Sequence, residues 1–219
     1  MHYQLSQNCT VLGKVIQKPD IQISFLSYLL RGSKNILIDT VPERAAEKYL
    51  EELSQCMDLT CLDAIILNHS EEDHSGALRL LLPHIPDIPV YCTLACKERL
   101  KDMYPTANIL AMEHNAELQL GEYQFRFIHT PGLHWDDNMV TYCENDQTLF
   151  SNDLFGQYLG SEPPLDNYIS SEQLIYNMKR YYEKVFSHAS KEEKKVLADI
   201  INLKLKVIAL DMVLFCPNK

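Results

Sequence analysis

The sequence has no apolar run long enough to span a membrane, and segment 1–15 lacks the basic start and apolar core of a signal peptide. Basic residues are few: 20 Lys and Arg stand against 30 Asp and Glu, and the formal net charge is −10. Nucleic acids and anionic membranes bind basic patches, so this balance argues against either as a partner. The expected location is the cytoplasm.

The seven cysteines form no C-x-x-C pair. Because their number is odd and the chain is expected to be cytoplasmic, free thiols are predicted rather than a disulfide framework. The sequence also has no internal repeat and no low-complexity linker. Its 219 residues are enough for one substantial α/β domain or two small ones.

Strand-like and helix-like segments come in two batches. Strands are predicted at 21–30, 35–39, 62–67, 90–92, 107–112, 117–120, 124–129, 139–143, 148–151 and 206–215. Helices are predicted at 45–57, 76–82, 94–103, 171–186 and 191–203. Two batches of strands, each followed by helices, predict a sandwich of two sheets with helices outside, an α/β (α+β) fold in one domain.

One loop, directly after an apolar strand-like run, is dense in metal-binding side chains. His69, Glu71, Asp73 and His74 form the pattern H-x-E-x-D-H. In an extended loop alternate residues point the same way, so the first three would share one side, and the next helix would be capped by Asp73 or Ser75. Two imidazoles and two carboxylates exceed what one tetrahedral ion needs once ligands from elsewhere are added, which suggests two adjacent metals. The alternative is a polar loop whose acids cap a helix.

Two later segments add candidate ligands. His129 and His134 lie on either side of a turn that Pro131 and Gly132 impose. Asp153 follows the apolar strand 148–151, and a carboxylate at a strand end can bridge two metals. Taken alone, His129 is equally consistent with a core or turn histidine, and Asp153 with an ordinary helix cap.

Together these motifs resemble a known family. The H-x-E-x-D-H loop, the HTPGLHW stretch at 129–135 and the FSNDLFG stretch at 150–156 are similar to the metallo-β-lactamase-like domain of flavodiiron proteins, or A-type flavoproteins. The segments Ser27-Tyr28-Leu29 and 37–40 are also similar, so that the resemblance spans about residues 20–217. The hydrolase branch of this fold has histidine where Glu71 stands, which makes the match specific.

The resemblance implies a metallo-β-lactamase-like αββα sandwich over residues 1–219 and a diiron centre. It assigns His69, Glu71 and His134 to one iron. It assigns Asp73 and His74 to the second iron, with Asp153 bridging the two. Mixed imidazole and carboxylate ligation suits iron or manganese better than a thiolate set does, although zinc stays an alternative.

Other residues are assigned supporting roles or none. Asn68, Ser75 and Asp137 are candidates for orienting the imidazoles. Trp135 and Tyr158 are candidates for lining the pocket, with core packing an equal alternative, and His129 is expected to be supporting or structural. No catalytic residue beyond the metal ligands and no flavin-binding residue is predicted.

Two departures from the family pattern stand out. The last iron ligand of the family is a histidine in a P-S-H-G stretch, and Lys219 falls in that place after Pro217-Asn218. A protonated lysine cannot ligate a metal. The sequence also shows no flavodoxin-like domain, so the chain is expected to be truncated at its C-terminal end, with FMN only on a separate partner, if at all.

The resemblance implies a non-haem diiron oxidoreductase that reduces O₂ to water, NO to N₂O, or both. Electrons would come from a separate flavoprotein or rubredoxin, and a homodimer is plausible. Three alternatives stay open: a stand-alone diiron sensor of oxygen or NO, a dinuclear metallo-hydrolase, and a decayed fragment. Glu71 in place of histidine argues against the hydrolase.

Overall fold

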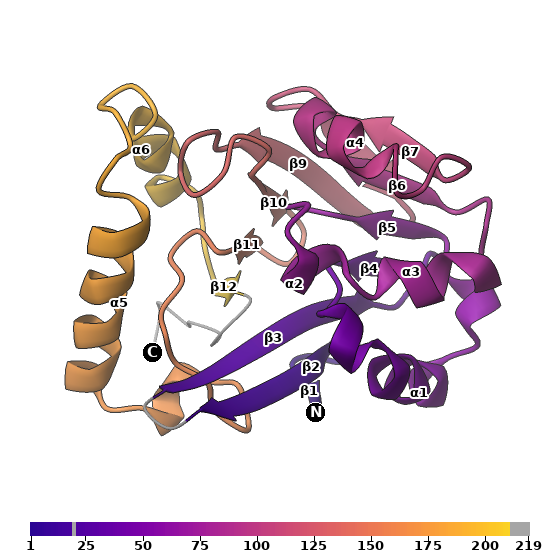
Figure 1. Ribbon diagram of the computed structural model, residues 1–219, viewed down its shortest axis with the longest axis horizontal. Helices are drawn as coiled ribbons and strands as arrows, with labels where there is room; N and C mark the ends of the chain where they lie inside the picture. The colour runs from indigo at the N-terminus through magenta and orange to yellow at the C-terminus, as the bar shows by residue number, and fades with distance from the viewer. Residues whose placement is uncertain (19–20, 211–219) are drawn as a thin grey trace.

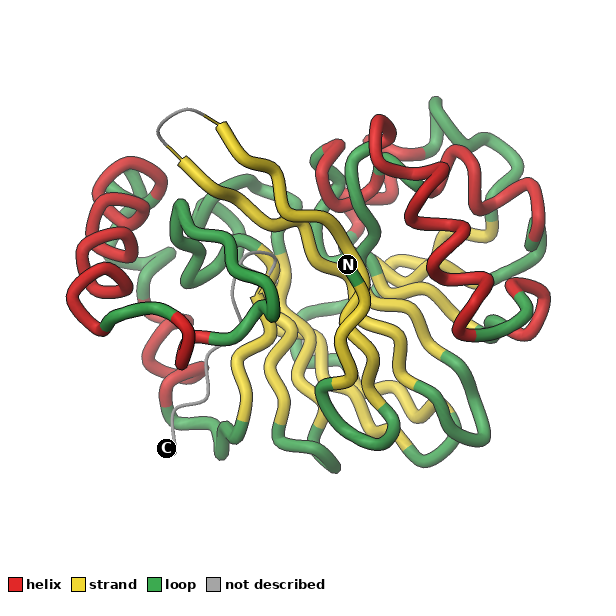
Figure 2. Tube along the Cα trace, turned by 90° about the horizontal axis from the view of Figure 1, so that it is seen from below, coloured by secondary structure: helices red, strands yellow, loops and turns green. Residues whose placement is uncertain are grey.

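Two β-sheets packed face to face form the centre of the molecule, and helices cover both outer faces (Figures 1 and 2). The structure is a computed structural model, and it describes residues 1–18 and 21–210. The predicted sandwich of two sheets with helices outside is confirmed.

The first sheet has seven strands in the order of the chain. They are β1 (His2–Gln4), β2 (Cys9–Lys18), β3 (Ile21–Leu30), β4 (Ile36–Ile38), β5 (Ala64–Ile66), β6 (Pro89–Cys92) and β7 (Asn108–Ala111). The pairs from β1 to β4 are antiparallel, and those from β4 to β7 are parallel. The carboxyl ends of β4, β5 and β6 therefore meet at one edge of the sheet.

The second sheet has five strands in the order β12-β11-β10-β9-β8. They are β8 (Glu117–Leu120), β9 (Tyr123–His129), β10 (Met139–Cys143), β11 (Thr148–Asn152) and β12 (Val207–Leu210). All pairs are antiparallel except β11 with β12. Every residue of β10 and β11 is buried, because these strands are covered on both faces.

Helices α1 (Ala46–Cys56), α3 (Leu78–Leu81) and α4 (Leu94–Leu100) pack on the first sheet, and α5 (Ser171–Val185) and α6 (Lys195–Ile201) pack on the second (Figure 1). The short α2 (Glu72–Ser75) follows β5. Within 1–18 and 21–210, four single-turn 3-10 helices lie at Glu43–Ala45, Leu59–Cys61, Leu82–His84 and Asp166–Tyr168. Among the described residues, no helix combines the length and apolar character needed to cross a bilayer.

The alternation of β3 shows how the layers are held together. Leu26 and Tyr28 point inward, into the cluster that also holds Phe125 and Phe127 of the second sheet. Leu29, the residue after Tyr28, points to the opposite face of the sheet, into the cluster beneath α1 and α3. Successive side chains of a strand face opposite sides, so one apolar strand contributes to two cores.

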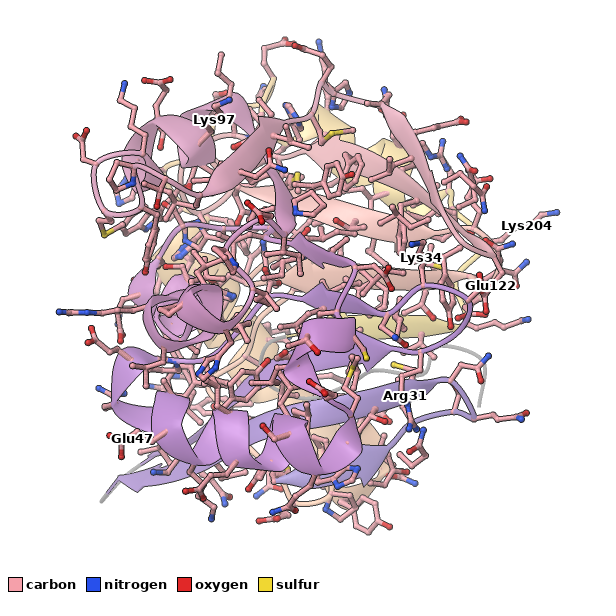
Figure 3. All side chains as sticks on the ribbon, turned by 90° about the vertical axis from the view of Figure 1, so that its right-hand side faces the viewer. Arg31, Lys34, Glu47, Lys97, Glu122 and Lys204 are labelled. Atoms are coloured by element: carbon pink, nitrogen blue, oxygen red, sulfur yellow. The ribbon has the colours of Figure 1, made fainter. Side chains whose placement is uncertain are left out.

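The two sheets are also joined at the end where β3 turns into β4. The backbone N–H and the hydroxyl of Ser33 both donate to Glu122 Oε2, at 3.0 and 2.6 Å. Tyr123 donates its hydroxyl to the carbonyl oxygen of Arg31 over 2.8 Å. Figure 3 shows Lys34 and Glu122 side by side at this end.

Several predicted elements need correction. Strands β1 and β2 were not predicted, because their pairing with β3 is decided across the sheet rather than by local alternation. The helix predicted at 76–82 shortens to α3, which the 3-10 turn at Leu82–His84 follows, and the separate short helix α2 before it was not predicted. The helix predicted at 191–203 shortens to α6. Within the strand predicted at 206–215, the structure describes β12 at Val207–Leu210. Positions 211–219, including Lys219, lie outside the described residues.

Candidate metal centre

Three segments at one end of the sandwich carry the predicted ligands: the loop 67–71 with α2 after β5, the loop 130–137 after β9, and the turn 153–156 after β11. All three residues of β5 are buried, and β5 pairs with strands on both sides. Its end is therefore a rigid anchor for the loop that follows. In Figure 1, α2 lies across from the end of β11 near the centre of the molecule.

Four of the six predicted ligands converge in one group. His69, Glu71, His134 and Asp153 each offer one ligand atom, and these atoms lie within 4.8 Å of one another. Glu71 Oε2 is 3.2 Å from His69 Nε2 and 3.0 Å from His134 Nε2. Asp153 Oδ2 is 3.4 Å from His134 Nε2. Two imidazoles and two carboxylates converging in this way are typical of a site for a divalent cation.

The other two predicted ligands lie on α2, on the far side of Asp153. His74 Nε2 donates to Asp153 Oδ2 over 2.9 Å, and Asp73 Oδ1 lies 3.9 Å from His74 Nε2. Asp153 Oδ2 therefore faces both His134 and His74. This is the position that a carboxylate shared by two metals would occupy.

The conformation of the H-x-E-x-D-H loop differs from the prediction. The backbone is extended at Glu71, but α2 begins at Glu72, so Asp73 is helical and not part of one extended row. Neither Asp73 nor Ser75 is an N-cap: Ala77 occupies the N-cap of α3 and Glu71 that of α2, and neither makes a side-chain cap bond. The hydroxyl of Ser75 donates instead to the carbonyl oxygens of Ser70 and Glu71, at 2.8 and 3.0 Å.

The site is closed on one side and open on the other. The side chains of His69 and His74 are fully buried, and that of Asp153 is 6% exposed. The side chains of Glu71 and His134 are 36% and 18% exposed. A small molecule from solvent would therefore approach past Glu71 and His134.

The charges of the site suit a cation. Hydrogen bonds from His134 and His69 lower the pKa of Glu71 to about 2. Burial alone would raise the pKa of Asp153, but the nearby His74 and His134 outweigh it, and the pKa falls below its ordinary value. Both carboxylates are thus ionised at neutral pH, as metal ligands must be.

Asp73 gives a direct test of whether these residues fit a metal. Its Oδ1 is buried and has no hydrogen-bond partner among the described residues. Burial is the main cause that raises the pKa of this carboxyl group. A buried carboxylate oxygen without a partner is costly, and a metal cation beside it would remove that cost. The donor set therefore fits a metal at the α2 side of Asp153 as well.

The loop after β9 brings His134 into the site through a strained turn. Gly132 has φ 77°, and His134 itself has φ 88°, a left-handed conformation that is uncommon for a residue with a side chain. Asp39, Asn152 and Phe155, next to the other ligand segments, also have positive φ. Strain of this kind gathers at sites whose geometry the rest of the fold enforces.

Asp137 orients His69, as predicted for it. His69 Nδ1 donates to Asp137 Oδ1 over 3.0 Å, and the backbone N–H of Ser70 donates to Asp137 Oδ2 over 2.9 Å. Burial opposes ionisation of Asp137, but these two bonds outweigh it and lower its pKa to about 2. With Nδ1 held in this way, Nε2 of His69 is left to face the site.

Asn68, a second of the three predicted orienting residues, bonds to Asp39 and Thr141 and to no imidazole. Its backbone N–H and its side-chain amide donate to the two carboxylate oxygens of Asp39, at 2.7 and 3.0 Å. Its Oδ1 accepts from the hydroxyl of Thr141 on β10, at 2.6 Å. This buried network joins β4, the ligand loop and the second sheet directly before His69.

The remaining predicted residues divide between the site and its surroundings. Trp135 lies at the site, with its ring edge-on to that of His69 at a centroid distance of 5.0 Å. Tyr158 packs against Tyr181 at 5.1 Å, one layer further out. His129 donates from Nε2 to the carbonyl oxygen of Met112 over 3.0 Å, a structural contact.

Two residues at the site were missed from the sequence. Tyr181 on α5 donates its hydroxyl to Asp153 Oδ1 over 3.1 Å, and no local pattern distinguishes it from Tyr182 beside it. Asp39 follows the short strand β4, and an acid directly after a buried strand was the available signal. The six described cysteines (Cys9, Cys56, Cys61, Cys92, Cys96, Cys143) carry free thiols, and none is among the converging donors.

Comparison with known proteins gives a consistent set of matches. The family model described as ODP family beta lactamase matches residues 23–211. The anaerobic nitric oxide reductase flavorubredoxin of Salmonella typhi is 36% identical over 187 residues, which cover 84% of this chain and 39% of that relative. A flavorubredoxin homologue of Escherichia coli O157:H7 is also 36% identical, with 46% of its length covered. The chain thus spans less than half the length of these relatives.

Solved structures give the same result. The flavodiiron protein of Giardia intestinalis superposes with a TM-score of 0.92 at 25% identity, covering 100% of this chain and 56% of that one. A flavodiiron protein variant from Thermotoga maritima reaches 0.87 at 27% identity, covering 100% and 58%. The rubredoxin:oxygen oxidoreductase of Desulfovibrio gigas, at 21% identity, reaches 0.90, covers 99% and 57%, and shows a shared fold.

Proposed function

The chain belongs to the ODP family of beta lactamases, and from this membership and the site geometry we propose that it is a non-haem diiron domain that reduces O₂ to water, NO to N₂O, or both. The resemblance to flavodiiron proteins and the metallo-β-lactamase-like fold are confirmed by the matches. We further propose that residues 1–219 form a single domain of this kind.

The convergence of His69, Glu71, His134 and Asp153, with His74 contacting Asp153 from α2, is the observation that carries the proposal. His69, Glu71 and His134 would hold one iron. Asp73 and His74 would hold the second, and Asp153 would be shared. In support, Asp153 Oδ2 faces both His134 and His74, and Asp73 Oδ1 is buried without a hydrogen-bond partner among the described residues.

Iron suits this donor set. Carboxylates are harder ligands than thiolates, and a site with three of them stabilises an oxidised metal. When bound, two irons can each supply one electron to a small oxidant, and an external donor must then restore them. The protein's own part is to hold these ligands, to orient His69 through Asp137, and to leave an opening beside Glu71 and His134.

The partners are proposed from the relatives. Their names include a flavorubredoxin and a rubredoxin:oxygen oxidoreductase, so we propose a flavin or rubredoxin type of redox protein as the electron donor. We propose that FMN, where it takes part, belongs to that donor. We also propose that the protein forms a homodimer and is located in the cytoplasm.

Metal analysis of protein purified without oxygen tests this proposal. We expect about two irons per chain, and consumption of O₂ or NO when a chemical reductant is supplied. His134→Asn is expected to lose iron and activity, whereas His84→Asn, which changes an exposed histidine away from the site, should keep both. Zinc as the bound metal, with hydrolysis of an ester or lactam and no gas consumption, would replace this proposal with the hydrolase.

A further inference from the structure

Arg99 on α4 makes three contacts with the segment that follows His134. Its guanidinium carbon lies 4.9 Å from the centre of the Trp135 ring. Its Nη2 pairs with Asp136, and its Nη1 lies 3.8 Å from Asp137 Oδ1. A guanidinium group can stack with its flat face while its edge donates to two carboxylates, which an ammonium group cannot do.

Two of these contacts lead to the same imidazole. The Trp135 ring lies edge-on to His69 at 5.0 Å, and Asp137 Oδ1 accepts the Nδ1 proton of His69 at 3.0 Å. His69 is thus held on one side by an aromatic ring and on another by a carboxylate, and Arg99 contacts both.

Helix α4 holds the segment at a second point. Thr93, the N-cap residue of α4, donates its hydroxyl to the carbonyl oxygen of Asp137 over 2.9 Å. Arg99 lies more than one turn further along the same helix. The segment 135–137, which comes after the left-handed residue His134, is therefore fixed to α4 at two separate places.

We propose that Arg99 is a positioning residue of the metal centre. It holds Trp135 and Asp137 in place, and through them it fixes the orientation of His69 and the path of the loop that presents His134. This inference rests on the proposed role of His69 and His134 as metal ligands, and it does not depend on which gas is reduced.

A positioning role of Arg99 and a purely electrostatic role predict opposite changes in metal affinity when Arg99 is replaced by glutamine. A cation near a metal site repels the metal, so if charge alone mattered, Arg99→Gln would bind metal more tightly and Arg99→Lys would bind it as the wild type does. If Arg99 acts by position, both variants lose the stacking and the two-pronged contact, and both bind metal more weakly. Removing a partner that contacts a ligand directly costs about 10–100-fold in affinity, so for Arg99, one contact further out, we expect about 3- to 10-fold.

The single tryptophan of the chain supplies the readout. Co²⁺, used alone as the probe metal, is titrated into metal-free protein while Trp135 fluorescence is recorded. Acrylamide quenching of the metal-free protein then measures how freely Trp135 meets solvent. Arg126→Gln is the matched control, because Arg126 stacks on Tyr142 at 5.5 Å and pairs with Glu144 at 3.7 Å but contacts no predicted ligand.

We expect Arg99→Lys and Arg99→Gln to weaken Co²⁺ binding, to raise the acrylamide quenching constant about twofold, and to leave the thermal unfolding midpoint of the metal-free protein close to that of the wild type. Arg126→Gln should change none of these. Tighter Co²⁺ binding by Arg99→Gln, or unchanged quenching in both variants, overturns the inference. Failure of the iron-loaded wild type to consume O₂ or NO would end the proposed function alone, whereas a wild-type chain that binds no Co²⁺ would end both.

Discussion

Asp39 is expected to be the most sensitive position outside the ligands themselves. Its side chain is 4% exposed, and its two oxygens accept the backbone N–H and the side-chain amide of Asn68. Asp39→Ala leaves both donors buried without a partner, at about 1–3 kcal/mol each. Burial raises the pKa of Asp39, so its charge is itself unfavourable inside the protein, and removing it offsets part of the loss. We expect a net loss of about 2–4 kcal/mol in the free energy of unfolding.

Two milder variants separate the individual contributions to this loss of stability. Asp39→Asn keeps one acceptor oxygen and is expected to cost about half as much as the alanine variant. Thr141→Val removes the hydroxyl that donates to Asn68 Oδ1 and should cost about 1 kcal/mol. Since both positions hold Asn68, the double variant should deviate from additivity by about 0.5 kcal/mol or more.

Urea unfolding followed by circular dichroism measures these differences. Asp87→Ala, on an exposed loop, serves as the control and should stay within about 0.5 kcal/mol of the wild type. Because Asn68 directly precedes His69, Asp39→Ala should also weaken metal binding under conditions where the protein is still folded. A loss below about 1 kcal/mol for Asp39→Ala would refute the reasoning, since it would mean that the buried donors find other partners.

Three further outcomes follow from single contacts. Asp73→Asn is expected to reduce the bound metal from about two ions to about one per chain, measured by mass spectrometry, while Glu72→Gln keeps both. Burial raises the pKa of the Cys9 thiol to about 12 from 9.0. The buried neutral thiol therefore contributes its full stability to the folded protein below about pH 9. Above that pH the unfolded chain loses the proton first, and stability should fall by about 1.4 kcal/mol per pH unit up to pH 12, a slope that Cys9→Ala should reduce in urea unfolding at pH 8 and 10.5. Gly13→Ala would place a Cβ 2.0 Å from the carbonyl oxygen of Phe25 at φ 150°, and thermal unfolding should show a loss of about 2–4 kcal/mol.

The sequence predicted correctly those features that depend on residues close together along the chain. Strands β3 and β10 have the predicted bounds, because apolar, aromatic and β-branched residues predominate in both. The candidate ligands were visible for a similar reason: histidines and acids seldom gather directly after buried strands without a role. The chemical type of the site, oxygen and nitrogen donors without thiolate, was therefore determined by the sequence alone.

The conformation of the site was decided by tertiary structure. Asp73 was expected on an extended loop, with His74 following where the chain turns into a helix. Both lie on α2, where Ser75 bonds back to the carbonyl oxygens of Ser70 and Glu71. Asn68 was expected to orient an imidazole, and it pairs with Asp39 instead.

The residues that complete the site come from distant parts of the chain. Tyr181 reaches Asp153 from α5, and Arg99 reaches Trp135 from α4. Periodicity and spacing describe neighbours along the chain, and they carry no information about which side chains two packed sheets and their helices bring into contact. The sequence by itself determined which candidate ligands are present and which strands they follow. Only the packing of the two sheets decided that these side chains meet around Asp153, and which groups hold them there.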